Sequence, residues 1–177
     1  MSDSVAINLK PLAPGVLLAV LSIAFGFVMG GAFGAAESSI KAHLAAEGDA
    51  VLASVYEGDT AKRDAVVSKS WSYLKRAHLH GGAIGAAALA AIALLGMLGA
   101  PGWLERITAW SFGAGSILYA LFWLAAGLTA PGAGSTGAAK DALQFMAIPG
   151  AGLCLVGVFG TLASVVSRLM LGTRDPG

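Results

Sequence analysis

Residues 75–96, KRAHLHGGAIGAAALAAIALLG, set two basic residues and two histidines directly before a run without a charged side chain. An α-helix rises about 1.5 Å per residue, so about 20 apolar residues cross the hydrocarbon core of a bilayer. The apolar run continues to residue 99 and has this length. We therefore expect a membrane-spanning helix over residues 81–99, with the histidines at one membrane face.

The composition of the whole chain is that of an integral membrane protein. Of its 177 residues, 56% are hydrophobic and 12% are charged, and the mean hydropathy is +0.76, whereas about a quarter of the residues in a soluble domain are charged. The formal net charge of +1 gives no reason to expect nucleic acid, whose binding needs many Lys and Arg side chains on phosphates. The one cysteine, Cys154, has no partner within the chain and so indicates no redox compartment.

Three further segments are long and apolar enough to span a bilayer. The four predicted membrane helices cover residues 15–36, 81–99, 107–129 and 143–171. The turn GAPG at residues 99–102 is so short that the helices on either side of it are antiparallel neighbours. We therefore predict one all-α membrane domain over residues 1–177, an antiparallel bundle of four transmembrane helices preceded by an N-terminal tail of residues 1–14.

The first apolar segment also resembles a cleaved signal peptide, because Lys10 precedes it and a small-residue GAA sequence ends it before Glu37. The apolar run of a signal peptide has about 7 to 15 residues. The segment at residues 15–36 is longer than that. We therefore expect a retained membrane helix.

The only long polar stretch lies between the first two apolar segments, at residues 37–80, and its acidic and basic residues balance. Apolar side chains form a stripe at helical spacings of four, three and four, at Val67, Trp71, Leu74 and His78. We therefore expect the first two helices to extend beyond the bilayer and to join there as a helical hairpin over residues 37–80.

Residues that favour turns and caps predict where these helices start and stop. The sequences EGD at residues 47–49 and EGDT at residues 57–60 are the predicted breaks in the hairpin. The candidate caps are Asp59 or Thr60 for the second long helix and Ser135 or Thr136 for the fourth.

Glycines line two of the predicted membrane helices at spacings that bring backbones together. Gly26, Gly30 and Gly34 recur every four residues, and Gly81, Gly82 and Gly85 follow the histidines. In lipid, such small-residue faces allow neighbouring helices to approach closely. Tight packing of the four helices is one interpretation, and a groove that admits a flat cofactor is the other.

The two histidines before the second membrane helix face different ways, because residues two apart on a helix point about 200° from one another. His78 continues the apolar stripe and is predicted to point into the bundle. His80 shares its side with Tyr73 and Arg76 and is predicted to face the lipid headgroups. The third histidine, His43, lies about 6 Å along the axis from His78 if the hairpin folds at its second predicted break. That offset is within reach of a bridging cofactor.

The sequence AHLHGGAIG, residues 77–85, resembles the His-x-His helix of the catalytic subunit of haem-copper oxidases, especially the cbb-type branch. The signature of that branch reads His-x-His-Ser-Gly-Ala-Leu-Gly, and the matching positions are His78, His80, Gly82, Ala83 and Gly85, with Gly81 in place of Ser and Ile84 in place of Leu. In that family the two histidines ligate different haems on opposite faces of the helix. The resemblance therefore implies haem ligation by His78, by His80 or by both, with Gly82 and Gly85 leaving room for the porphyrin.

The resemblance covers only residues 77–85, and the oxidase site needs further histidines for copper and for a second axial haem ligand. This chain has 3 histidines in all, which excludes oxygen reduction by this chain alone. What the resemblance implies is one haem b, held by His78 and by His43 or the weaker ligand Met146, in the way that four-helix bundles hold haem. Copper is a second candidate metal at these residues.

Two classes of function follow. The first is a small haem b-binding redox or quinone-linked subunit, which transfers electrons through a haem near the membrane face. The second is a cofactor-free membrane anchor or structural subunit of a larger complex, with the histidines as interfacial anchors. Either class makes the chain a subunit rather than an enzyme by itself. The middle of each apolar segment lacks Asp and Glu, which disfavours a proton-coupled transporter.

The expected partners are the lipid bilayer, other membrane subunits or further copies of this chain and, for the redox class, a quinone. The richness in Ala and Gly indicates a bacterial cytoplasmic membrane. Four spans put both termini on one side, whose short segments carry Lys10, Arg106, Arg168 and Arg174. These residues favour the cytoplasmic side for the termini, whereas the basic residues of the hairpin favour the opposite orientation.

Overall fold

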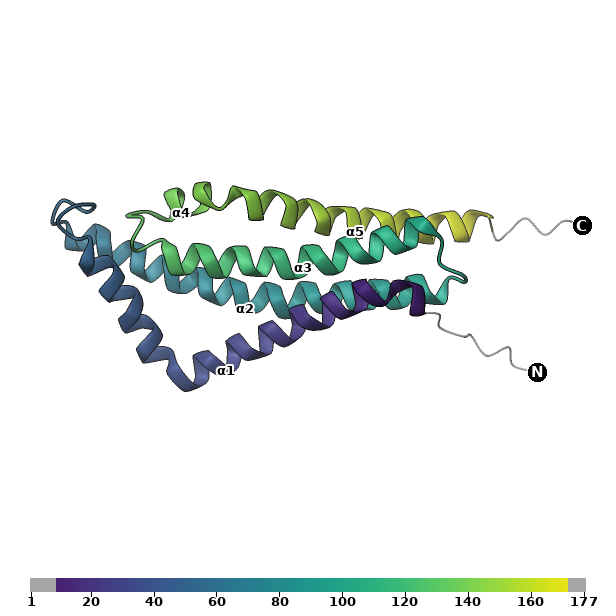
Figure 1. The fold of residues 1–177 in the computed structure, drawn as a ribbon, viewed down its shortest axis with the longest axis horizontal. Coiled ribbons are helices and arrows are strands. Elements are labelled where there is room, and N and C mark those ends of the chain that lie inside the picture. The colour runs from purple at the N-terminus through teal and green to yellow at the C-terminus, as the bar shows by residue number, and fades with distance from the viewer. Residues whose placement is uncertain (1–8, 172–177) are drawn as a thin grey trace, which may run out of the picture.

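The computed structural model describes residues 9–171, and all regular elements in this range are helices (Figure 1). They are a 3-10 helix η1, Lys10–Leu12, and the α-helices α1, Ala13–Ala50; α2, Thr60–Met97; α3, Trp103–Thr129; α4, Thr136–Ala142; and α5, Gln144–Leu171. Residues 1–8 of the predicted N-terminal tail, and Arg174, lie outside the described residues.

Four of these helices are long and apolar enough to cross a bilayer, which confirms the predicted class of multi-pass membrane protein. The spans are Lys10–Ala50, Thr60–Met97, Trp103–Thr129 and Gln144–Met170. Each matches one predicted apolar segment. With 38 residues each, α1 and α2 are longer than the about 20 residues that one crossing requires.

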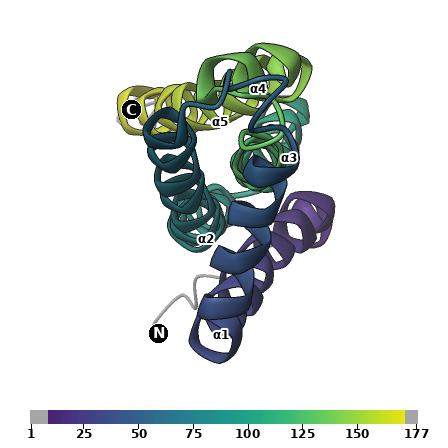
Figure 2. The same ribbon diagram turned by 90° about the vertical axis from the view of Figure 1, so that its left-hand side faces the viewer.

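The long helices lie side by side and run back and forth along the molecule (Figure 1). The third of them, α3, packs against α1, α2 and α5, whereas α2 and α5 touch only slightly. The start of α1, the α2–α3 turn and the end of α5 lie together at what we call the terminal end (Figure 1). The α1–α2 loop at residues 51–59 and the α3–α4 loop at residues 130–135 lie at the opposite end, the loop end (Figures 1 and 2).

A bend divides α1 into two halves at Ala36, whose φ of −141° and ψ of 25° are not helical. The bend lies where the predicted apolar segment at residues 15–36 gives way to polar residues. Figure 2 shows the second half of α1 crossing the loop end of the bundle. The rings of Phe33 and Trp71, with centroids 4.8 Å apart, pack between α1 and α2 near the bend.

The predicted break at residues 47–49 is wrong, because α1 continues to Ala50. Gly48 lies inside the helix and lets α2 pack there. A Cβ at this position would be 3.0 Å from Cγ of Arg63 and 3.3 Å from a methyl group of Val67. Glycine disfavours a helix interior by about 1 kcal/mol relative to alanine, but here its missing side chain leaves room for Arg63 and Val67.

The second predicted break, at residues 57–60, is confirmed. The chain reverses through Glu57 and Gly58, which have positive φ angles of 56° and 81°. Asp59 is the cap of α2, as predicted, because its carboxylate accepts a 2.9 Å hydrogen bond from the backbone N–H of Lys62. The chain therefore reverses directly before α2, and not at the EGD sequence of residues 47–49.

The region predicted as one capped fourth helix contains two helices. The hydroxyl of Ser135 accepts a 3.0 Å hydrogen bond from the backbone N–H of Ala138 and caps the short α4. This helix ends at Ala142, and α5 begins at Gln144. The predicted cap therefore belongs to α4, while the predicted apolar segment at residues 143–171 corresponds to α5.

Glycines also bring the backbones of α3 and α5 together. A Cβ at Gly115 would lie 2.6 Å from the backbone nitrogen of Cys154, and one at Gly150 would lie 3.0 Å from the backbone nitrogen of Tyr119. A side chain at Gly115 would force the two backbones apart, and one at Gly150 would make a contact tighter than ordinary van der Waals distance. The two helices are therefore in backbone contact, as small-residue faces allow in lipid.

Candidate functional site

The predicted glycine faces of the first two membrane helices pack against each other. A Cβ at Gly26 would lie 2.6 Å from the backbone nitrogen of Gly82. One at Gly85 would lie 3.0 Å from the carbonyl oxygen of Ala19. The backbones of α1 and α2 are therefore in contact here. The groove that the sequence offers to a flat cofactor is filled at these positions by the neighbouring helix.

His78 lies at this α1–α2 interface, half-buried and pointing into the bundle as predicted. Its Nδ1 atom is 2.7 Å from the carbonyl oxygen of Gly26. A carbonyl can only accept, so we assign the proton to Nδ1, which donates this hydrogen bond. Gly30 makes room for the ring, since a Cβ there would lie 2.9 Å from its Cε1 atom. In the neutral imidazole, Nε2 then carries a lone pair.

His80 packs on the opposite side of α2, against α3. Its ring stacks on Tyr119 with a centroid distance of 5.3 Å and an interplanar angle of 19°, and it meets Trp123 edge-on at 6.0 Å. The prediction that this face turns to the lipid headgroups is wrong for His80 and for Tyr73, which is 1% exposed. The predicted angle between the directions of His78 and His80 was right, but α3 rather than lipid headgroups covers the side of α2 that carries His80.

An arginine completes an aromatic cluster around His80. The guanidinium carbon of Arg76 lies 4.8 Å from the ring centroid of Trp123 and 5.3 Å from that of Tyr73. These are cation–π contacts, which Arg makes readily with Trp and Tyr. The Trp123 Nε1 atom is buried without a hydrogen-bond partner among residues 9–171. The sequence signal for this cluster was the pair of aromatic residues four apart, Tyr119 and Trp123, on the third apolar segment.

The remaining candidate ligands lie elsewhere. His43 is exposed on the second half of α1. Met146 packs against the buried cluster that contains Tyr73 and Trp123. Within residues 9–171, no three His, Cys, Asp or Glu side chains gather into a group that could hold a metal ion. The contacts that the His78 ring makes are with Gly26 and Phe33 of α1.

The register of the hairpin explains the position of His43. Gly48 faces Arg63, and the ammonium group of Lys41 lies 5.1 Å from the ring centroid of Trp71. His43, between these two contacts in sequence, is therefore level with a part of α2 on the loop side of Trp71. The predicted position was nearer to His78, because it assumed straight helices placed symmetrically about residues 57–60, whereas the loop that joins them covers residues 51–59.

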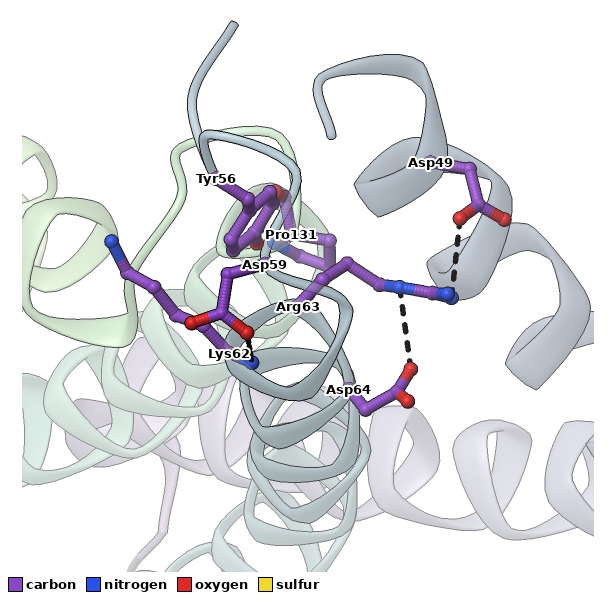
Figure 3. Close-up of polar contacts among 7 residues, drawn as sticks. All are labelled: Asp49, Tyr56, Asp59, Lys62, Arg63, Asp64 and Pro131. Carbon is purple, nitrogen blue, oxygen red and sulfur yellow. Dashed lines mark hydrogen bonds and ion pairs between the residues drawn. The ribbon is translucent and has the colours of Figure 1, made fainter. Parts of the chain in front are cut away.

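Polar contacts fix the loop end of the bundle (Figure 3). Arg63 pairs with Asp49 of α1 and with Asp64 of α2, at 3.2 Å in both cases. The hydroxyl of Tyr56 donates a 2.7 Å hydrogen bond to the carbonyl oxygen of Pro131, which joins the two loops. Burial raises the pKa of Tyr56 above its ordinary value, and the nearby positive charge of Arg63 opposes this shift in part.

Comparison of the chain with protein-family models, with curated proteins and with solved structures found no match. The function is therefore argued from the contacts of this chain alone.

A cleft of about 300 Å³ lies between α1 and α2 near the loop end, lined by Lys41, Leu44, Asp64, Val67, Ser68 and Trp71. Both charged groups in it have partners within the protein. Lys41 pairs with Glu37, and Asp64 pairs with Arg63. The cleft therefore presents no uncompensated charge that would select an ionic ligand.

Proposed function

We propose that this chain is a cofactor-free structural subunit of a larger membrane complex. One observation supports the proposal above the others. Two of the three histidines and several of the glycines that suggested a cofactor are engaged in contacts between helices, although an added Cβ at Gly82 would meet no atom within 4 Å. His78 binds a carbonyl of α1, His80 stacks on α3, and Gly26 and Gly85 face the backbone of the neighbouring helix. A porphyrin between α1 and α2 would have to separate two backbones that touch.

In this proposal the chain is an antiparallel bundle of four transmembrane helices in a bacterial cytoplasmic membrane, with both termini on the cytoplasmic side. The parts of α1 and α2 at the loop end form the helical hairpin outside the bilayer. The ion pair between Arg63 and Asp49 joins the two arms of that hairpin, and the bond between Tyr56 and Pro131 holds the hairpin against the α3–α4 loop. The hairpin and the lipid-facing sides of the helices are then the surfaces on which other subunits assemble.

The outer side of α1 supplies a surface for another helix. An added Cβ at Gly31 or Gly34 would meet no atom within 4 Å. The nearby side chains of Phe27 and Val28 are 77% and 70% exposed. Small residues beside large apolar ones allow a helix of another subunit to approach closely in lipid. We assign this face of α1 to a contact with another membrane subunit or with a second copy of the chain.

The test is the mass of the protein particle after extraction in a mild detergent, measured by size exclusion with light scattering. We expect a protein mass above the 17.7 kDa of one chain. Gly34→Leu should reduce this mass, because the larger side chain occupies the approach of the partner helix. Gly152→Leu, on α5, is the matched control, since Gly152 also has open space around it. A wild-type particle of one chain, or equal effects of the two variants, would contradict the proposal.

A haem b-binding redox or quinone-linked subunit is the second candidate, and one observation favours it. The hydrogen bond from His78 Nδ1 to the Gly26 carbonyl is the kind of support that orients a histidine for ligation through Nε2. Such a subunit would show a Soret absorption band, and His78→Ala would remove it.

A further inference from the structure

A second cleft, of about 330 Å³, opens at the terminal end between the start of α1 and the start of α3. Its walls include Pro11, Pro14 and Gly15 on one side and Arg106, Ile107 and Trp110 on the other. The floor is the close approach of the two helices at Gly15 and Ala109, where a Cβ on the glycine would lie 3.0 Å from that of the alanine. From this contact toward the terminal end, the two helices separate and leave a groove between them.

One side of the groove is apolar and open to the surroundings. Ile107 and Trp110 are 50% and 49% exposed. Both side chains lie near the start of the membrane span Trp103–Thr129. Tryptophan is enriched at this depth, where the hydrocarbon core meets the headgroups. The groove therefore leads from the headgroup layer toward the hydrocarbon.

The mouth of the groove carries one exposed positive charge, Arg106. Within residues 9–171 this guanidinium has no acidic partner. The carboxylate of its neighbour Glu105 instead accepts a 2.9 Å hydrogen bond from the backbone N–H of Gly102. A guanidinium binds phosphate through two parallel hydrogen bonds and with charge complementarity. Nothing acidic in the wall of the groove would bind the cationic part of a zwitterionic headgroup.

We propose that this groove is a binding site for an anionic phospholipid. The phosphate lies on Arg106, and one acyl chain follows the apolar wall of Ile107 and Trp110 toward the hydrocarbon core. The site is independent of the proposed role of α1 in assembly, because it lies at the opposite end of the transmembrane part of that helix from Gly34. Basic side chains at the cytoplasmic face, where the proposed orientation puts the terminal end, attract anionic lipids.

The test measures the thermal stability of the purified chain in detergent, with phosphatidylglycerol or phosphatidylcholine added. We expect phosphatidylglycerol to stabilise the protein at lower concentrations. Arg106→Gln should weaken its apparent affinity about fivefold, the loss expected for one basic residue near a membrane surface. Arg168→Gln is the control, since Arg168 is exposed at the same end but lies on α5. Equal affinity of Arg106→Gln and wild type would overturn the proposal, and so would equal stabilisation by water-soluble glycerol phosphate.

A second measurement locates the acyl chain without altering the charge. Phosphatidylglycerol with brominated acyl chains quenches the fluorescence of tryptophans that it touches. Trp110→Phe should remove a saturable part of this quenching, whereas Trp71→Phe, near the loop end, should leave that part in place. A saturable component that survives in Trp110→Phe would overturn the placement of the lipid in this groove.

Discussion

The substitution Gly26→Ala tests the contact between α1 and α2 with a single methyl group. The new Cβ would lie 2.6 Å from the backbone nitrogen of Gly82 and 3.2 Å from the carbonyl oxygen of His78. Both are backbone atoms of a helix, so neither can move without its helix. The two helices must separate to ordinary contact distance. We therefore expect the substitution to destabilise the protein although alanine is the better helix former.

The magnitude follows from three contributions. Overpacking of a close contact costs about 1–3 kcal/mol. Separation of the helices weakens two hydrogen bonds, from His78 to the Gly26 carbonyl at 2.7 Å and from Ser22 to the Gly81 carbonyl at 3.0 Å, which are worth about 1 kcal/mol each. The higher helix propensity of alanine offsets about 1 kcal/mol of this loss of stability. We expect the free energy of unfolding to fall by about 2–4 kcal/mol.

The assay is reversible unfolding in mixed micelles, followed by far-UV circular dichroism. Gly34→Ala is the matched control on the same helix, because an added Cβ there meets no atom within 4 Å. It gains helix propensity without a clash and should be as stable as the wild type or slightly more stable. If Gly26→Ala were as stable as Gly34→Ala, the backbone contact between α1 and α2 would be refuted.

Other predictions concern the loop end and use the same assay. Tyr56→Phe removes the bond to the Pro131 carbonyl and should lower the free energy of unfolding by about 1–2 kcal/mol; no loss would show that the two loops are held together by other contacts. The raised pKa of Tyr56 means that its contribution is complete below the unfolded-state pKa of about 10 and is lost as the pH rises above it, so the wild type should lose more stability in that window than Tyr56→Phe does. Asp59→Ala removes the cap of α2 and should cost about 1 kcal/mol, whereas Asp64→Ala, on the same helix, should cost less because the pair with Arg63 is largely exposed on the Asp64 side.

The membrane helices could be predicted closely because length and apolarity suffice to recognise a span. The inward direction of His78 could also be predicted, since it continues the stripe that ends at Leu74, a side chain that is 1% exposed. The first feature depends on the length and apolarity of one helix, and the second depends on its periodicity. They need no knowledge of its neighbours.

The predictions were wrong at positions where the packing of a second helix determines the structure. The side of α2 that carries Tyr73 and His80 has polar atoms, and only the position of α3 turns it into a packed aromatic face. In the same way, the sequence around Gly48 predicts a helix break, whereas in the structure this residue lies inside α1 and α2 packs against it. The bend at Ala36, between the two halves of α1, has no proline to signal it. The sequence of a helix predicts the direction in which each side chain points. It does not predict which neighbouring helix packs against that side.

The visible absorption spectrum of the purified chain, oxidised and reduced, tests most directly whether the histidines serve packing or a cofactor. A cofactor-free structural subunit gives no Soret band, and His78→Ala leaves its spectrum unchanged while lowering the free energy of unfolding, because the bond to the Gly26 carbonyl is lost. A Soret band in stoichiometric amount that His78→Ala abolishes would contradict this role and would establish the haem-binding subunit in its place.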